Sequence, residues 1–307
     1  MGEHIFTEVA SGLRFPEGPV VMPDGQIVVV EINAGRVTRI DPTTGAKTVI
    51  AAGLGGPNGL ALGPDGMLYL CNNGGFDWIE GDGVLMPFET APDYTGGSIQ
   101  RVDPATGAVE TLYTHAGDVQ LRGPNDIVFD ADGGFWFTDF GKIRRRDEDI
   151  TGIFYAKTDG SFIEEVIHPM RGPNGIGLSP DGGTLYVAET FTGTLHAFAV
   201  TSPGKVGGGG SASFPGRFLH RPAGAKYFDS LAVEANGNIC VGTLGVGGIS
   251  VISPEGEAVE FVETGDPVTT NIAFGGADMM TAYITCSSSG RLLSTRWKRP
   301  GLKPAFP

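Results

Sequence analysis

Five oxygen-bearing side chains occupy the same position of a repeated sequence phrase and could together bind a metal ion. These anchor residues are Glu17, Asn58, Asn125, Asn174 and Asp229. If the repeats form equivalent strands around a ring, the side chains converge near its axis. Carboxylate and amide oxygens are ligands of hard cations, above all calcium, and the two carboxylates would balance a divalent charge. One such residue is commonly only a turn former, but five at one repeat position favour a metal site.

The phrase around each anchor residue predicts a β-hairpin. Apolar residues follow at the second and fourth positions, such as Leu60 and Leu62, and this alternation predicts a strand with one buried face. An Asp-Gly or Asn-Gly pair follows at positions seven and eight in all five copies, which is typical of a tight turn. A sixth, degenerate copy is anchored at Thr270, because choosing Asn271 would exchange the two faces of its strand.

A second hairpin phrase follows each of these five, for example at Gly35 and Gly97. Two hairpins per repeat predict a four-stranded antiparallel sheet, which is a propeller blade. Six repeats of roughly 51 residues account for the 307 residues. Only one strand follows Gly290, so an N-terminal strand is expected to complete the last blade and close the ring. The sequence predicts an all-β, six-bladed β-propeller of four-stranded antiparallel blades, as a single domain over residues 1–307.

Composition excludes several classes of protein. Glycine supplies 50 of the 307 residues, which indicates many turns and argues against a helical bundle. A formal net charge of −14 disfavours nucleic-acid binding, because an acidic surface repels phosphates. No apolar stretch has the length of a membrane span, and the first residues do not resemble a secretory signal. Three scattered cysteines, expected to be buried, are typical of a reducing compartment, so a cytoplasmic location is expected.

Two segments exceed the repeat and are expected to overhang the end of the ring that carries the anchor residues. They are Asn73–Gly96 and Phe140–Thr151. Long loops on a rigid scaffold often determine what a protein binds, so the first insert, which carries Trp78, is predicted to be a lid or a pocket wall. A loop that only covers apolar surface is the alternative. Two further runs are interpreted as a solvated loop and as a hairpin loop of the fourth blade: Lys142–Arg146 and Gly204–Gly210.

Polar residues also end the second strand of most repeats and return to the level of the anchors. They are Glu31, Asn72, Asp139, Glu189 and Thr243. They are interpreted either as supports of the site or as exposed strand ends. No nucleophile elbow, Walker A motif or H-E-x-x-H motif occurs, and the five histidines share no repeat position, which disfavours an imidazole zinc site.

Five segments of the repeat carry a resemblance to a known family. They are FPEGPVV at 15–21, GPNDIVFDADGGFWFTD at 123–139, GPNGIGLSPDGGTLYVAET at 172–190, FDSLAVEANGNICVGT at 228–243 and TNIAFGGADMMTAYIT at 270–285. Through them the chain resembles the senescence marker protein/gluconolactonase/luciferin-regenerating enzyme family of six-bladed propellers. The resemblance implies one divalent metal ion, usually Ca²⁺, with Zn²⁺, Mn²⁺ or Mg²⁺ as alternatives. The ligands that it implies are Glu17, Asn125, Asn174 and Asp229.

The resemblance also implies an activity. Members of the family hydrolyse sugar lactones and sometimes organophosphates, so a calcium-dependent, gluconolactonase-like hydrolase of a sugar-type or related lactone is expected. Asp229 resembles the general base of lactonase members, and Asp126 is the second choice. The residues expected to contact a small-molecule lactone or ester substrate are Asn58, Arg122, Trp78 and Asn125.

Two other functions stay open at this point. One is a phosphotriesterase or arylesterase that uses the same site, and the other is a calcium- or ligand-binding propeller without turnover. Neither nucleic acid nor a membrane is an expected partner. A monomer or a small homo-oligomer is expected.

Overall fold

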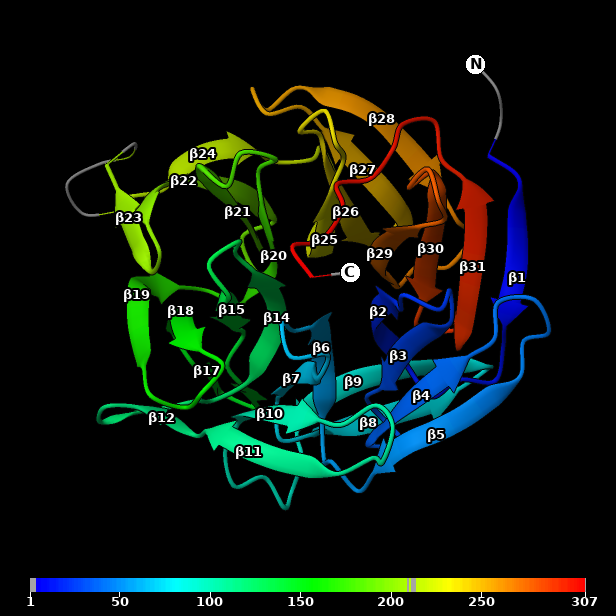
Figure 1. The fold of residues 1–307 in the computed structure, drawn as a ribbon, viewed down its shortest axis with the longest axis horizontal. Helices are drawn as coiled ribbons and strands as arrows, with labels where there is room; N and C mark the ends of the chain where they lie inside the picture. Colours follow the sequence, from blue (N-terminus) through cyan, green and yellow to red (C-terminus); the bar gives the residue numbers. More distant parts are fainter. Residues whose placement is uncertain (1–3, 209, 211–213, 307) are drawn as a thin grey trace.

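The computed structural model describes residues 4–208, 210 and 214–306. These residues form 31 strands and no helix. Six antiparallel sheets surround a central channel, so the chain is a six-bladed β-propeller, as expected from the repeat (Figure 1). No helix of the described part of the chain has the length and apolarity needed to cross a membrane.

In blades 1 to 5 the innermost strand comes first in the chain, and the following strands lie progressively further out. Blade 1 consists of β2 (Pro16–Val21), β3 (Ile27–Glu31), β4 (Arg36–Ile40) and β5 (Lys47–Ala52). Blade 2 consists of β6 (Pro57–Leu62), β7 (Leu68–Asn72), β10 (Ser98–Val102) and β11 (Val109–Tyr113). Blade 3 consists of β14 (Pro124–Phe129), β15 (Gly134–Asp139), β18 (Thr151–Lys157) and β19 (Ile163–Met170).

The remaining blades follow the same order. Blade 4 consists of β20 (Pro173–Leu178), β21 (Thr184–Glu189), β22 (Thr194–Ser202), β23 (Lys205–Gly207) and β24 (Arg217–His220). Blade 5 consists of β25 (Tyr227–Val233), β26 (Ile239–Leu244), β27 (Gly248–Ile252) and β28 (Ala258–Glu263). Blade 6 consists of β29 (Thr269–Gly275), β30 (Thr281–Cys286), β31 (Arg291–Arg296) and, from the N-terminal part of the chain, β1 (Phe6–Ala10).

Pairing of β1 with β31 closes the ring, as predicted. The register pairs Phe6 with Thr295 and Glu8 with Leu293. In Figure 1 these two strands lie side by side, although they come from the two ends of the chain. Closure packs the sheet faces of blades 6 and 1 against each other, which an open array of blades would leave exposed.

Blade 4 departs from the four-stranded pattern, because its outer strand is split in two. The nine-residue strand β22 pairs with β24 through Leu195–Ala197 and with β23 through Ala199–Ser202. The run Gly204–Gly210 was expected to be a hairpin loop of this blade. Gly204 does lie in the β22–β23 turn, but Lys205–Gly207 form β23. Residue 209 of this run lies outside the described residues.

The apolar core lies between the blades rather than at the axis. Six clusters of buried side chains fill the six junctions between neighbouring blades. Cys71, Cys240 and Cys286 are buried in this core as free thiols, as the sequence predicts. Because each blade packs on both neighbours, the inner strands are held rigidly around the channel.

The two ends of the channel differ. The inner hairpins turn at one end, the turn face, and their five glycines have positive φ angles of 70–92° (Gly25, Gly66, Gly133, Gly182 and Gly237). The opposite end, the anchor face, carries three extra hairpins: β8 (Phe76–Gly81) with β9 (Val84–Thr90), β12 (His115–Ala116) with β13 (Val119–Gln120), and β16 (Ile143–Arg144) with β17 (Asp147–Glu148). The hairpin β12–β13 was not predicted.

Candidate metal centre

Each inner strand contains an irregularity where its anchor residue stands. In blade 3, for example, Pro124 pairs with Asp139 but Ile127 pairs with Phe137, so the register shifts beside Asn125. Comparable shifts occur in the inner hairpins of the other five blades. A bulge redirects side chains locally, which releases the anchor residues from the regular alternation of the strand. Asp229 is half-buried, and the other four anchor residues are buried.

Glycine beside two anchors lets neighbouring inner strands approach closely. A Cβ atom on Gly59 would lie 2.3 Å from the main-chain oxygen of Asn125. A Cβ atom on Gly175 would lie 2.5 Å from that of Asp229. Any side chain at these two positions would push the inner strands apart, so glycine brings the anchor positions together.

The sixth blade contributes Asn271 to this ring. Thr269 pairs with Cys286, and Ile272 with Ile284, so Thr270 is the register equivalent of the anchors, as the sequence predicts. Asn271 nevertheless acts in the site, because its Nδ2 donates a 2.8 Å hydrogen bond to Glu17 Oε2. The amide of Gly18 donates to the same oxygen at 2.6 Å. This role of Asn271 was not predicted from the sequence. The available signal was its amide side chain, which directly follows the anchor position.

Two threonines tie the anchors of blades 3, 4 and 5 together. Thr190 Oγ1 accepts a 3.1 Å hydrogen bond from Asn174 Nδ2 and donates to the main-chain oxygen of Phe228 at 2.7 Å. Thr138 Oγ1 accepts from the amide of Asp126 and donates to the main-chain oxygen of Asn174. These bonds hold the neighbouring inner strands of blades 3, 4 and 5 in one arrangement.

Three carboxyl groups of the site interact unfavourably with one another. Burial, and then the charge of Glu17, raise the pKa of Asp229 well above its ordinary value, and a hydrogen bond from Asn174 opposes this. Burial and Glu17 also raise the pKa of Asp126, to about 8. Burial raises the pKa of Glu17, although hydrogen bonds from Asn271 and Gly18 act in the opposite direction. A cation among these groups would compensate their charge.

The donor set fits a hard cation. Asn125 Oδ1 is buried and has no hydrogen-bond partner, which a ligand oxygen aimed at an ion would explain. Glu17, Asn125, Asn174 and Asp229 offer only oxygen ligands of the kind that Ca²⁺ accepts. Among the described residues, no three His, Cys, Asp or Glu side chains form a group that could hold a metal ion. The four predicted ligands contain only two carboxylates, and the other two are amides.

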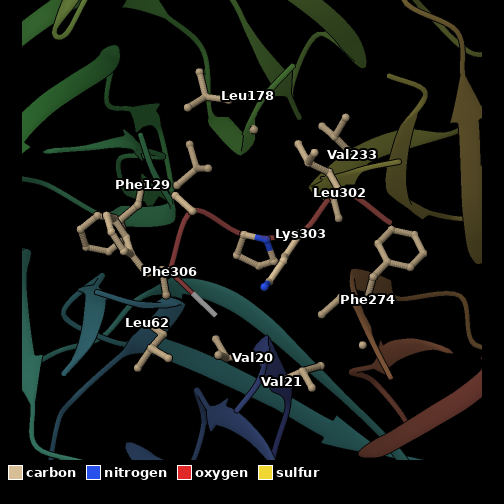
Figure 2. Close-up of a pocket in the computed structure, with 18 of the residues that line it drawn as sticks. Val20, Val21, Leu62, Phe129, Leu178, Val233, Phe274, Leu302, Lys303 and Phe306 are labelled. Atoms are coloured by element: carbon tan, nitrogen blue, oxygen red, sulfur yellow. The ribbon is translucent and has the colours of Figure 1, made fainter. Parts of the chain in front are cut away.

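Asp126 stands directly after the anchor residue Asn125, and its carboxyl group is close enough to Glu17 for that charge to raise its pKa. Its two carboxylate oxygens accept hydrogen bonds from the amides of Ile127 (3.0 Å) and Ile176 (3.3 Å). It also borders a cavity of about 810 Å³ that opens toward the turn face. Figure 2 shows this chamber, with apolar side chains such as Phe129 and Phe274 around it.

The C-terminal segment crosses the turn-face chamber. The amide of Leu302 donates to the main-chain oxygen of Val233, and the ring of Phe306 packs against Phe129 with 5.6 Å between centroids. Lys303 and Phe306 lie at the chamber in Figure 2. None of the five anchor residues lines this chamber. The candidate metal centre therefore faces the other end of the channel.

The residues that end the second strands support the anchors rather than being exposed strand ends. Glu31, Asn72, Asp139 and Glu189 accept hydrogen bonds from main-chain amides two or three residues before the anchors of blades 1 to 4, at Arg14, Gly56, Arg122 with Gly123, and Arg171. All four are buried. Thr243 differs, because its hydroxyl donates to Val241 and contacts Ser250. In blades 1 to 4, these hydrogen bonds from strand-end side chains to main-chain amides fix where the inner strand begins.

The first insert lies along the anchor face of blades 1 and 2 (Figure 1). Trp78 contacts Phe15 at 5.2 Å between ring centroids, and Phe15 is two residues from Glu17. The main-chain amide of Leu85 donates a hydrogen bond to the main-chain oxygen of Ser288 in blade 6. The hairpin thus forms a wall beside the channel. Arg122 is exposed next to it, and its guanidinium donates a hydrogen bond to Gln120.

The second insert corrects the prediction that Lys142–Arg146 is a solvated loop. Lys142 is 1% exposed, and its ammonium group lies against the first insert. Arg144, Arg145 and Arg146 are exposed, as expected. The sequence shows a charged run, but the acceptors of Lys142 lie 67 and 69 residues away in the chain.

Comparison with known proteins agrees with this architecture. A lactonase of Staphylococcus epidermidis is 26% identical over 234 residues, 76% of this chain but only 64% of the relative's length. A gluconolactonase from Xanthomonas campestris has a similar structure, with a TM-score of 0.76, 21% identity, and coverage of 96% of this chain and 90% of that one. A calcium-binding protein, regucalcin, from Agrobacterium tumefaciens also has a similar structure, with a TM-score of 0.72 and 18% identity. The match covers 95% of this chain and 94% of that one.

Most of the chain also matches a known protein family. The SMP-30/gluconolactonase/LRE-like region matches residues 15–288. This range includes all six inner strands and every anchor residue. The chain therefore belongs to the SMP-30/gluconolactonase/LRE-like family.

Proposed function

We propose that this protein is a hydrolase that opens a lactone ring with a divalent cation in its channel, Ca²⁺ being the favoured ion. The observation that carries the proposal is the cluster of Glu17, Asp126 and Asp229 beside Asn125, whose buried Oδ1 has no partner. Uncompensated charges of this kind are costly unless a cation or protons balance them. Membership of a family with lactonase relatives supports the class of reaction.

Glu17, Asn125, Asn174 and Asp229 would hold the ion through side-chain oxygens. A divalent cation bound there supplies a Lewis acid for an ester carbonyl oxygen. Asn58 and Arg122 lie at the same end of the channel and would contact the hydroxyl or carboxylate groups of a substrate. Trp78 would contribute apolar surface through the wall formed by the first insert.

Asp229 is the better general base. Hydrolysis adds water across the acyl carbon–oxygen bond, so one water proton must reach the ring oxygen as that bond breaks. Asp229 is half-buried, and a bound cation would favour its ionised form, which can accept this proton. Asp126 is a poorer choice, since both its oxygens already accept main-chain hydrogen bonds and it borders the opposite chamber.

Hydrolysis assays with and without chelation test the proposal. Sugar lactones, less polar lactones, aryl esters and a phosphotriester would be compared before chelation, after it, and after Ca²⁺ is restored. Lactone opening that is lost on chelation and regained with Ca²⁺ is expected. In Asp229→Asn, kcat is expected to fall by about 10²-fold or more, and Asp126→Asn to fall less. The exposed Asp132→Asn serves as the control and should match the wild type.

Two outcomes would contradict the proposal. Ca²⁺ binding without turnover of any compound would favour a binding propeller. Faster turnover of the phosphotriester or aryl ester than of every lactone would favour the other hydrolase class.

A further inference from the structure

Lys142 is a buried cation held by main-chain carbonyls instead of a carboxylate. Its Nζ donates to the main-chain oxygens of Asn73 at 2.8 Å and Gly75 at 2.6 Å. The same atom lies 4.0 Å from the ring centroid of Phe76 and 5.1 Å from that of Tyr94. No described carboxylate forms an ion pair with it. All four partners belong to the first insert, whereas Lys142 belongs to the second.

A lysine suits this position because the backbone at the start of the first insert is not part of the regular strands of blade 2. Gly74 and Gly75 have φ angles of 76° and 98°, so the root of the first insert cannot continue the ladder of blade 2. Carbonyls at such a root need donors when they are buried. The ammonium group supplies several donors from a long apolar stem, and the two ring faces add favourable electrostatics.

The first insert is also attached at its far end. Arg14 donates to both carboxylate oxygens of Glu80 at 2.7 and 2.8 Å, and Leu85 donates to Ser288 at 3.1 Å. The Arg14–Glu80 pair is exposed and contributes little to stability. Lys142 at the root is the strongly buried contact. Between the two attachments, Trp78 packs against Phe15 close to Glu17.

We propose that Lys142 is a positioning residue that fixes the first insert against the anchor face and thereby sets the shape of the substrate-binding wall. Lys142 forms no hydrogen bond with a described anchor residue, and it acts through Asn73, Gly75 and Phe76. The effect on substrate binding rests on the proposed lactonase function, whereas the fixing of the insert does not. Loss of Lys142 should raise KM and leave kcat nearly unchanged, because the chemical groups stay in place.

Hydrogen exchange tests the fixing of the insert independently of activity. Amide exchange of residues 73–96 would be measured by mass spectrometry in the wild type, Lys142→Met and Lys142→Arg. Methionine keeps an apolar stem but cannot donate to the two carbonyls, so exchange in this segment should rise about 10-fold or more. Arginine should restore part of the protection. Lys205→Met, which removes an exposed lysine paired with Glu164, is the matched control and should change nothing.

The inner strands β6 and β14 serve as internal references. Unchanged exchange in residues 73–96, or an equal rise in these strands, would overturn the role of Lys142. Exchange that rises in the insert alone, together with an increase in KM of about 5-fold or more and kcat within about 2-fold, supports the whole proposal. Faster exchange with unchanged KM would overturn its substrate-binding part. Absence of lactone turnover in the wild type would refute the proposed function, and the exchange result would still decide the role of Lys142.

Discussion

Glu31 offers a direct test of the idea that strand-end side chains position the anchors. Its buried carboxylate accepts hydrogen bonds from the Arg14 amide at 2.8 Å, from Arg36 at 2.7 and 2.8 Å, and from Thr38 at 2.6 Å. Burial raises the pKa of Glu31, but these hydrogen bonds outweigh it, so the pKa lies below its ordinary value. The ionised carboxylate is therefore stabilised by the fold. This contribution is present above about pH 4.5 and is lost as the pH falls further.

Replacing Glu31 with alanine removes the acceptor from all these donors at once. Breaking a buried ion pair in this way costs about 3–5 kcal/mol. An unfolding entropy of about 2.1 cal/mol/K per residue then predicts a decrease in Tm of roughly 6 °C for a chain of this length. Urea unfolding followed by tryptophan fluorescence would give the change in free energy, and thermal unfolding the change in Tm.

Glu80→Ala is the matched control. Glu80 also accepts two hydrogen bonds from an arginine, but its side chain is 59% exposed whereas that of Glu31 is 0% exposed. Water and salt screen an exposed pair, so its loss is expected to change the free energy of unfolding little. If Glu31→Ala destabilised the protein no more than Glu80→Ala, the assigned role of the strand-end carboxylates would be wrong.

Three further predictions follow from charges and packing. After chelation, folding stability should fall from about pH 4 to pH 8, because burial raises the pKa of Asp126 from 3.8 to about 8 and the folded chain therefore keeps this proton over that range. Saturating Ca²⁺ should flatten this trend in urea unfolding, and an unaltered trend would refute it. Burial lowers the pKa of Lys142 to about 7, against the charges of Asp139 and Asp149. The buried ammonium therefore costs stability below that pH, the wild type should gain stability as the pH rises toward 10.5, and Lys142→Met should lack this gain. Phe306→Ala should lower the free energy of unfolding by about 1–2 kcal/mol, since its half-buried ring packs on Phe129, and an effect no larger than that of the exposed Lys303→Met would contradict this.

The sequence allowed the blades and the order of the anchors to be predicted, because both depend on local patterns. Alternating apolar residues and Asp-Gly or Asn-Gly turns determine each inner hairpin with little help from distant contacts. The single strand after Gly290 was enough to predict closure by β1. The anchors were recognised by their repeat position, although the bulges that redirect them leave no clear local signal.

What could not be predicted depends on contacts between distant segments. In the sequence, Lys142 is one residue of a charged run. It becomes a buried hydrogen-bond donor only because the two inserts approach each other in the fold. In the sequence, Asn271 is only the neighbour of an anchor position. Its hydrogen bond to Glu17 joins residues that lie 254 positions apart. The C-terminal segment has no strand periodicity, and its contacts with Val233 and Phe129 appear only when the ring is closed.

We propose that four anchor residues bind one divalent cation on the anchor side of the channel. The decisive experiment is a crystal structure of the protein with Ca²⁺. A single ion is expected in the channel, within about 2.3–2.6 Å of side-chain oxygens of Glu17, Asn125, Asn174 and Asp229. A channel without an ion at saturating Ca²⁺, or an ion held by other residues, would contradict it.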